Sequence, residues 1–343
     1  MTTAITVFDV GGTHIRQARW LRGGELHTRT SRPSPSFKRF PRATVAELRD
    51  MMVRDLCDSV PDAPGPVVGL SFGAALDHRS GIVYASAPLW GEHSEPYDLR
   101  EALTSRRADV RWCIVNDVTA ALLHTAADSS RSGHRKVMLA TISTGIACRV
   151  IDQRQGRIPV DGCGLQGEIG HLPANAELAG RPIELDCDCG RTGHLAAYSS
   201  GPGIARMAQA LKRREPERWA ASGLGRLTAD GMDFETSLRH ALDARDGLAA
   251  ELLDAVTAPV AAVLRTALCL DPEIDEAVLT GGVVHGLGHH YRCALMEHLT
   301  RQGLYLTSER SPDWLERRIT VTSPGEADSL AGAGIAACAG VPA

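Results

Sequence analysis

The chain has 343 residues, of which 43% are hydrophobic and 23% are charged, and its formal net charge is −4. This composition is typical of a soluble globular protein, the length predicts two domains, and the negative charge argues against a nucleic-acid partner. We find no apolar run of about 18 residues and no basic N-terminal segment ahead of an apolar stretch, so neither a membrane span nor a signal peptide is predicted.

Nine cysteines are present, which is an odd number, and most of them are scattered among core-like segments. This usage predicts a reducing cytoplasmic environment rather than a disulfide framework.

The first part of the chain alternates short apolar strands with helices. Residues 5–10 predict a strand that ends in a glycine turn, and the alternating stretch 15–20 predicts a second strand, so that the two form a hairpin. A helix, two more strands and another helix are predicted at residues 43–60, 67–72, 110–115 and 118–127.

The second part begins with a similar strand–turn–strand unit, at residues 136–143 and 147–152. Its resemblance to the first hairpin predicts a duplicated α/β fold, with domains at residues 1–122 and 123–343 flanking a cleft. The last helix is able to return to the first domain. A long apolar helix, a strand and the final helix are predicted at residues 248–270, 277–279 and 328–339, and polar stretches at residues 31–40, 129–135 and 215–227 predict surface loops.

Glycine turns follow three of the predicted strands, with the sequences DVGGTH, STG and TGG. Glycine lets backbone N–H groups approach a phosphate closely, so three such turns predict a nucleotide site, whereas one alone would be an ordinary tight hairpin. Asp9 is expected to orient a water bound to Mg²⁺, and the alternative is a carboxylate that only caps its own turn. The candidate nucleotide-binding residues are Asp9, Gly11, Gly12, Thr13, Thr144, Gly145, Gly281 and Gly282.

The sequence VNDV places a carboxylate where an apolar strand ends and a helix begins. Ligands bind at the carboxyl ends of strands in open α/β sheets, so Asp117 is the candidate general base for phosphoryl transfer to a hydroxyl. Asn116 is expected to bind a neighbouring hydroxyl. An ordinary helix N-cap is the alternative for this pair.

The segment GLQGEIGH and the later CDCGRTGH together hold two cysteines and two histidines. His171, Cys187, Cys189 and His194 are a donor set that zinc accepts in a tetrahedral structural site. Two buried thiols are the alternative for the cysteines, and a surface histidine is the alternative for His194. Glu168 lies three residues before His171, and the two are expected to form a rigid wall that binds substrate hydroxyls.

These motifs resemble those of the ROK family of bacterial sugar kinases, which have the duplicated actin-like (ribonuclease H-like) ATPase fold. DVGGTHIR, VNDVTAA, GEIGH with CDCGRTGH, and TGGVV match the family along nearly the whole chain. The resemblance implies ATP and Mg²⁺ as cofactors, Asp117 as the base, and Glu168 and His171 as substrate ligands. It also implies a structural Zn²⁺ held in part by His171 and a homodimer, whereas the lack of a long apolar run predicts no membrane partner.

Three departures from the family pattern bear on the zinc site and on the substrate: the first would make the zinc set Cys₂His₂, and the other two would remove polar contacts to the substrate. His194 stands where the family has a third cysteine, Ala196 stands where sugar kinases have a glutamate near the anomeric carbon, and Leu89 stands where an asparagine faces the sugar. Leu89 is expected to present an apolar face instead. Losing one charged hydrogen bond costs about 1.5–3 kcal/mol, which argues against glucose.

A C7-cyclitol of the valiolone type is therefore the favoured polyol substrate. A hexose or amino sugar, such as glucose, kanosamine or N-acetylmannosamine, is the alternative. A non-catalytic ROK-type regulator is disfavoured, because the first strand is predicted to begin near Ile5, without a preceding helix-turn-helix segment, and because the chain is acidic. A sugar-binding pseudokinase is disfavoured because Asp117 is present.

Overall fold

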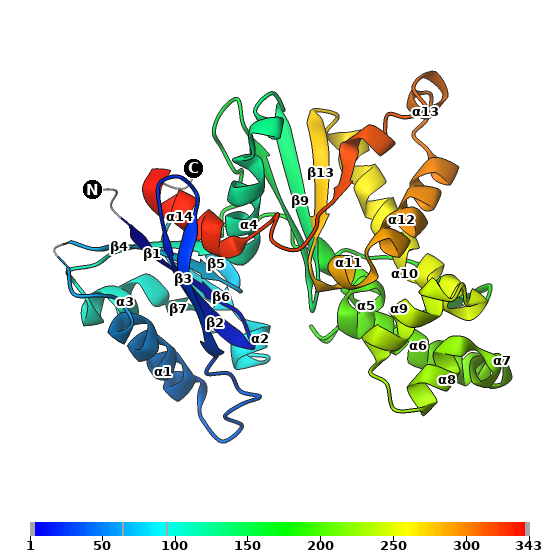
Figure 1. Ribbon diagram of the computed structural model, residues 1–343, viewed down its shortest axis with the longest axis horizontal. Helices are drawn as coiled ribbons and strands as arrows, with labels where there is room; N and C mark the ends of the chain where they lie inside the picture. The colour runs from blue at the N-terminus through cyan, green and yellow to red at the C-terminus, as the bar shows by residue number, and fades with distance from the viewer. Residues whose placement is uncertain (1–3, 64, 94, 340–343) are drawn as a thin grey trace. The chain divides into compact units, whose positions relative to one another are not determined.

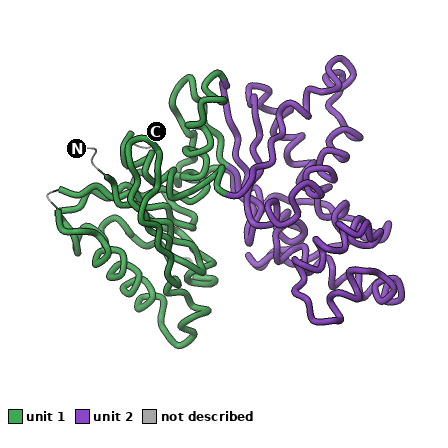
Figure 2. Tube along the Cα trace, viewed as in Figure 1, with its two compact units in different colours: residues 1–133, 149–166, 325–343 green, residues 134–148, 167–324 purple. Residues whose placement is uncertain are grey.

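The chain folds into two α/β units, which the computed structural model describes for residues 4–63, 65–93 and 95–339. Figure 2 colours the first unit, residues 1–133, 149–166 and 325–343, green and the second unit, residues 134–148 and 167–324, purple. Residue 122, the predicted domain boundary, falls inside helix α4 (Asp117–Ala126), and the C-terminal helix α14 (Ser329–Ala339) lies in the first unit.

The first unit is built on a five-stranded mixed sheet in the order β3-β2-β1-β4-β8 (Figure 1). β1 pairs with β2 in antiparallel fashion, which confirms the predicted hairpin, whereas β1, β4 and β8 run parallel. Their carboxyl ends therefore meet at one edge of the sheet. The strands are β1 (Ile5–Val10), β2 (His14–Trp20), β3 (Leu26–Pro33), β4 (Val67–Phe72) and β8 (Arg111–Asn116).

Alternation along β1 supplies a core on each face of this sheet. Ile5 and Val7 are buried with residues of α14, whereas Phe8 and Val10 are buried with residues of helix α1 (Val45–Asp58). α1 begins at a capping box in which Thr44 accepts from the Glu47 N–H and the Glu47 carboxylate accepts from the Thr44 N–H. The remaining elements of the unit are β5 (Ala75–Asp77), β6 (Ile82–Ala85), α2 (Ala87–Trp90), β7 (Tyr97–Asp98) and α3 (Leu99–Arg106).

The second unit has a four-stranded sheet in the order β10-β9-β13-β14, in which β13 is parallel to both of its neighbours. These strands are β9 (Lys136–Ile142), β10 (Ile146–Asp152, of which residues 149–152 are counted in the first unit), β13 (Ile274–Thr280) and β14 (Ile319–Val321). A two-stranded hairpin joins β11 (Ala176–Leu178) to β12 (Arg181–Ile183). The helices are α5 (Leu195–Ser199), α6 (Gly201–Arg214), α7 (Pro216–Ala221), α8 (Gly223–Ala229), α9 (Phe234–Asp243), α10 (Gly247–Leu270), α11 (Gly282–Leu287), α12 (His289–Gln302) and α13 (Thr307–Arg310).

Helix α10 corrects one expectation from the sequence. An 18-residue window within its 24 residues has a mean hydropathy of 1.6, so the chain does contain a stretch long and apolar enough to cross a membrane. However, 61% of that window is buried inside the unit, where α10 packs against α5, α12 and β11. α10 is therefore apolar on most sides because it is the central helix of the second unit.

Two segments predicted as loops are regular structure. Residues 31–33 belong to β3, an edge strand whose mostly exposed side chains hide the usual alternation. Residues 216–221 and 223–229 form α7 and α8. A proline in the first turn starts α7, the Ser222 hydroxyl caps α8 by accepting from the Gly225 N–H, and Trp219 and Leu224 are buried.

Helix α14 approaches its neighbours at three glycines. A Cβ atom on Gly332 would lie 1.7 Å from the Ala120 carbonyl oxygen of α4. A Cβ on Gly69 of β4 would lie 2.2 Å from the Ala333 oxygen, and one on Gly334 would lie 2.3 Å from the Trp20 ring. The absence of a side chain at these positions is what lets α14 lie directly on the sheet and on α4.

We therefore expect Gly332→Ala to destabilise the protein by about 1–3 kcal/mol, the usual cost of overpacking, because the new methyl group must push α14 away from α4. Thermal and urea unfolding measure this change.

The matched control is Gly286→Ala in α11, where a Cβ meets nothing within 4 Å. The same substitution there should leave stability unchanged or raise it by up to about 1 kcal/mol, because alanine loses less entropy in a helix. Equal effects at the two positions would contradict the close packing of α14.

Candidate functional site

The sequence-predicted site residues fall into two groups, one in each unit. Asp9, Gly11, Gly12, Thr13, Asn116 and Asp117 belong to the first unit. The second unit holds Thr144, Gly145, Glu168, His171, Cys187, Cys189, His194, Gly281 and Gly282. In the first unit these residues lie at the end of β1 or just after it, or at the junction of β8 and α4, and in the second unit they lie in the turns after β9 and β13 and in the segment 168–194.

Asp9 lies near the carboxyl end of β1 with only 13% of its side chain exposed. Its Oδ2 accepts from Arg16 Nη2 at 2.7 Å and Arg16 Nε at 3.0 Å, and its Oδ1 accepts from the Ser71 hydroxyl at 2.6 Å. Both oxygens of the carboxylate are therefore engaged in hydrogen bonds, which fixes its orientation. Sequence reasoning missed Arg16 and Ser71, although the hairpin register places Arg16 directly opposite Asp9.

The first glycine turn contacts the segment that contains Pro88 and Leu89, and the sequence predicts that Leu89 faces the substrate. A Cβ on Gly12 would lie 2.4 Å from the Cβ of Pro88, so only glycine permits this contact. The turn is closed by hydrogen bonds from the Gly11 N–H to the His14 oxygen at 3.0 Å and from the Ser34 hydroxyl to the Gly11 oxygen at 2.6 Å. Leu89 is completely buried in the core with Trp90, so the prediction that it presents an apolar face to a ligand is wrong.

Asn116 and Asp117 lie at the junction of β8 and α4. Asn116 is the N-cap of α4: its Oδ1 accepts from the N–H groups of Val118 and Thr119, and its Nδ2 donates to the Ala74 oxygen at 2.7 Å. The capping role is thus present, and it leaves the second amide hydrogen of Asn116 for another partner. Asp117 Oδ1 accepts from the Val118 N–H at 3.0 Å, and a Cβ on Gly73 would lie 3.5 Å from Asp117 Oδ2. Gly73, directly after β4, therefore lies beside this carboxylate, and a Cβ there would make only an ordinary contact with it.

In the second unit, two glycine turns lie against each other at the ends of β9 and β13. Gly281 has a φ of +109°, and a Cβ there would lie 2.4 Å from the Ile142 oxygen, so both backbone angle and space require glycine. The Gly201 N–H at the start of α6 donates to the Ser143 oxygen at 2.8 Å. The exposed Thr144 and Gly145 thus lie in a turn tied to α6 and bordered by Gly281, an arrangement suited to backbone contacts with a nucleotide.

Glu168 and His171 are held by glycines that pack on β10. The Cys148 N–H donates to the Gly167 oxygen at 2.7 Å, and Cβ atoms on Gly167 and Gly170 would lie 2.2 and 2.4 Å from the oxygens of Cys148 and Ile146. The His171 N–H then donates to the Glu168 oxygen at 3.1 Å, which closes a single 3₁₀ turn. The two candidate substrate ligands are therefore fixed to each other through the backbone.

The four predicted metal ligands converge. The ligand atoms of His171, Cys187, Cys189 and His194 all lie within 4.8 Å of one another. Cys187 Sγ lies 3.9 Å from His171 Nδ1, and Cys189 Sγ lies 3.2 Å from His194 Nδ1. Adjacent ligands of tetrahedral zinc lie about 3.3–3.8 Å apart, given the usual Zn–N and Zn–S bond lengths. His194 is only 9% exposed, which rules out the surface-histidine alternative.

The protein environment of Cys187 disfavours its thiolate unless a cation is present. Burial raises the pKa of the Cys187 thiol above its ordinary value. A metal ion does the opposite, because it binds the thiolate and displaces the proton. The donor set and its spacing therefore fit a zinc ion.

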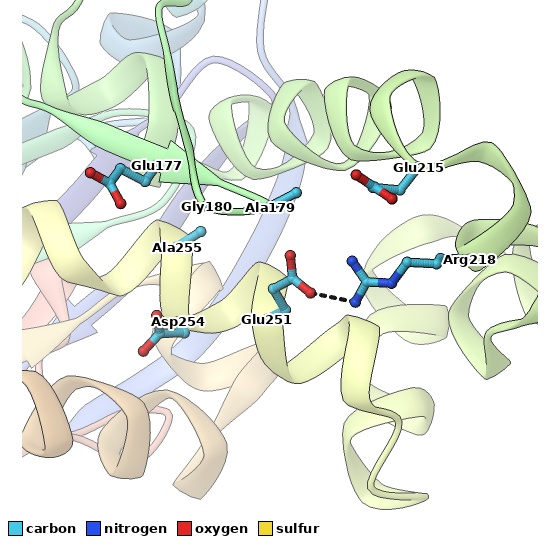
Figure 3. Close-up of a pocket in the computed structure, with 8 residues that line it drawn as sticks. All are labelled: Glu177, Ala179, Gly180, Glu215, Arg218, Glu251, Asp254 and Ala255. Carbon is cyan, nitrogen blue, oxygen red and sulfur yellow. Dashed lines mark hydrogen bonds and ion pairs between the residues drawn. The ribbon is translucent and has the colours of Figure 1, made fainter.

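A different cavity of about 420 Å³ lies elsewhere in the second unit (Figure 3). Arg218 Nη2 donates to Glu251 Oε2 at 2.7 Å across it. Its lining residues are Glu177, Ala179, Gly180, Glu215, Arg218, Glu251, Asp254 and Ala255. Because four carboxylates line it, this cavity is a poor site for a phosphorylated ligand, and it contains none of the sequence-predicted residues.

Comparisons with known proteins agree with these motifs. A sequence profile described as the ROK family matches residues 5–338. The 2-epi-5-epi-valiolone 7-kinase of an Actinoplanes species is 56% identical over 98% of this chain and 94% of its own length. The C(7)-cyclitol 7-kinase of Streptomyces hygroscopicus subsp. jinggangensis is 30% identical over 88% of this chain and 85% of its own. A ROK family glucokinase from Streptomyces griseus, solved with glucose and AMPPNP, superposes with a TM-score of 0.69 at 19% identity, covering 96% of this chain and 98% of that one.

Proposed function

The chain belongs to the ROK family, and from this premise we propose that it is an ATP-dependent kinase that phosphorylates a C7-cyclitol of the valiolone type. The observation that carries the proposal is the 56% identity, over nearly the whole chain, to a kinase named for 2-epi-5-epi-valiolone. The substrate predicted from Ala196 and Leu89 is of the same class, although the burial of Leu89 leaves Ala196 as the remaining support for that prediction. A cytoplasmic location remains a prediction from the cysteine usage, and a homodimer remains a prediction from the family resemblance.

In the proposed reaction, Asp117 is the general base. Its carboxylate accepts the proton of the substrate hydroxyl as that oxygen attacks the γ-phosphorus of ATP. The new P–O bond forms while the bond to the β,γ-bridging oxygen breaks, so ADP leaves with the electron pair. The position of Asp117 at the start of α4, beside Gly73, supports this role because the carboxylate is presented at the carboxyl end of the sheet.

The nucleotide is assigned to the glycine turns. Gly11, Gly12 and Thr13 are proposed to contact its phosphates in the first unit, with Thr144, Gly145, Gly281 and Gly282 contacting it in the second. Mg²⁺, when bound, neutralises charge on the β- and γ-phosphates. Both oxygens of Asp9 already accept hydrogen bonds from Arg16 or Ser71, which disfavours direct ligation of the ion. Asp9 is therefore proposed to accept hydrogen bonds from the water molecules bound to the ion.

The substrate hydroxyls are assigned to Asn116, Glu168 and His171. The second amide hydrogen of Asn116 is the group proposed to meet a hydroxyl, since the other contacts Ala74. His171 is proposed to serve both a structural Zn²⁺ and the substrate, one through each ring nitrogen. The metal would thereby fix the ring that binds the hydroxyl.

Asp117→Asn should retain the fold and ATP binding but lower kcat by about 10²–10⁴, because the amide cannot accept the proton. Asparagine preserves the side-chain shape and can still accept from the Val118 N–H. Steady-state assays of ATP consumption with a valiolone-type cyclitol measure the effect.

The control for this variant is Asp62→Asn, which removes a fully exposed carboxylate of the same unit. Its turnover should match that of the wild type. Near-normal turnover in Asp117→Asn would remove Asp117 from the mechanism.

Freshly purified protein should contain about one zinc ion per chain, and Cys187→Ala, Cys189→Ala and His194→Ala should each lose it with a fall in melting temperature. Binding should weaken as the pH falls, because protons compete with the metal for thiolate and imidazole ligands. Plasma emission spectrometry and a chelator titration measure content and affinity.

Cys293→Ala is the control, since Cys293 is an exposed cysteine on α12, outside the cluster. It should retain zinc fully. Metal-free wild-type protein with unchanged stability would sink the zinc proposal, and full affinity in His194→Ala alone would assign the fourth position to another group.

Ala196→Glu should improve kcat/KM for glucose relative to a valiolone-type cyclitol by about tenfold, because it restores about one charged hydrogen bond near the anomeric carbon. Ala220→Glu adds the same charge at an exposed position on α7 and should leave the ratio unchanged. Efficient turnover of glucose, kanosamine or N-acetylmannosamine by the wild type would favour the sugar-kinase alternative over the cyclitol.

A further inference from the structure

The side of the sheet on which Asp9 lies follows from the alternation of β1. Ile5 and Val7 are buried against α14, and Asp9 continues this odd-numbered series. On β2, Ala18 and Trp20 are buried against α14, and Arg16 continues the even-numbered series. The hairpin register thus places Asp9 and Arg16 side by side on the face that α14 covers.

Arg16 bridges Asp9 to the beginning of α14. While Nε and Nη2 donate to Asp9, Nη2 also donates to the Ser329 hydroxyl at 2.8 Å. Nη1 lies 3.6 Å from Asp328 Oδ1, and the Asp328 side chain is only 6% exposed. Burial alone would lower the pKa of Arg16, but the carboxylates of Asp9 and Asp328 outweigh it and leave that pKa above its ordinary value. The guanidinium is therefore a permanent cation between two carboxylates.

Asp328 is anchored independently of Arg16. Its N–H donates to His124 Nδ1 of α4 at 3.0 Å, and its Oδ1 accepts from the Leu330 N–H at 3.0 Å. Burial lowers the pKa of His124, which suits a neutral ring that accepts this hydrogen bond. Helix α4 therefore has two roles: it begins with Asp117, the proposed base, and through His124 it anchors Asp328, which in turn pairs with Arg16.

We propose that Asp328 and Arg16 form a relay through which α14 sets the position of Asp9, so that Arg16 is a positioning residue for binding of the magnesium–nucleotide complex. This inference rests on the proposed function. Arg16 takes two lone-pair directions of Asp9 Oδ2 and Ser71 takes one of Oδ1, so the carboxylate has one orientation before any ligand arrives. A fixed acceptor binds the ion's water shell without first losing side-chain freedom.

The test uses isothermal titration calorimetry of the full chain with AMPPNP, a non-hydrolysable ATP analogue, with excess Mg²⁺ and with EDTA. The quantity compared is the ratio of the two dissociation constants, which reports how strongly the ion aids binding. We expect the wild type to bind more tightly with Mg²⁺ and Arg16→Met to lose about 10- to 100-fold of that enhancement, the usual effect of removing a group that orients a metal-binding residue. Asp328→Asn should act in the same direction with a smaller loss.

Arg29→Met is the matched control, because Arg29 Nη1 lies 3.4 Å from Asp328 Oδ2 and no hydrogen bond joins Arg29 to Asp9 among the described residues. It should keep the wild-type ratio. Arg16→Lys retains the charge but lacks the two forked donors, so its Mg²⁺ enhancement should lie between those of Arg16→Met and the wild type. If Arg16→Met does not fold, Arg16→Lys is compared with the wild type in its place.

The outcomes separate the relay from the function on which it rests. A lowered melting temperature with an unchanged Mg²⁺ enhancement in the Arg16 and Asp328 variants would overturn the relay and leave these residues a purely structural role. A wild type that binds AMPPNP under neither condition would overturn the proposed kinase function itself. Cyclitol affinity in the absence of nucleotide should be equal in all variants, and a parallel loss there would also overturn the relay.

Discussion

The packing of α14 on the first unit is the constraint on which the rest of that unit depends. Three glycines, Gly69, Gly332 and Gly334, have no side chain to separate the helix from its neighbours. The backbone of α14 can therefore contact β4, α4 and the Trp20 ring directly. Because protein interiors are close-packed, a helix that is this near cannot shift without moving all three neighbours. The end of β1, which carries Asp9, and the start of α4, which carries Asp117, are therefore both held in position by packing against the C-terminal helix α14.

The candidate site of the second unit is held by contacts of irregular backbone with strands rather than by a packed helix. Its glycines at positions 167, 170 and 281 let irregular backbone lie on the strands β9 and β10. The segment that follows Gly170 has little core of its own, and His171 and Cys189 are exposed. A cation held by the two thiols and two imidazoles would replace the missing hydrophobic packing, which is how small metal-binding loops are commonly stabilised.

The sequence predicted those parts of the fold whose cause is local. Strand β4 was predicted at its observed bounds, and α1, α4, α10 and α14 were predicted to within two residues at either end, because apolar periodicity, caps and glycines mark them. The family and the actin-like fold are confirmed. Edge strand β3 and helices α7 and α8 were missed, because polar surface residues outnumber the few buried ones.

The contacts between distant segments were beyond local reasoning. The burial of Leu89 depends on the core formed by α1 and β4. The four candidate zinc ligands come together although Cys187 lies 16 positions after His171 in the sequence. The Arg16–Ser329 contact joins positions 313 residues apart, which no periodicity can indicate. Asn116 illustrates a further limit: the capping role and the predicted hydroxyl contact use different atoms of one amide, so the sequence alone had no reason to choose between them.

Phosphoryl transfer depends more on position than on unusual reactivity, since the transition state is stabilised chiefly by correctly placed charges and donors. In the first unit, the proposed base and the carboxylate assigned to the ion's water shell lie on the ends of regular elements rather than on free loops. Asp117 begins a helix whose N-cap, Asn116, is held by hydrogen bonds to Val118, Thr119 and Ala74, and Asp9 lies near the end of a strand with both oxygens engaged. Their separation is set by parallel strands and by the helix that packs across them. A substitution within α14 that moves that helix therefore disturbs both carboxylates together, although none of its residues touches a substrate in the proposed mechanism.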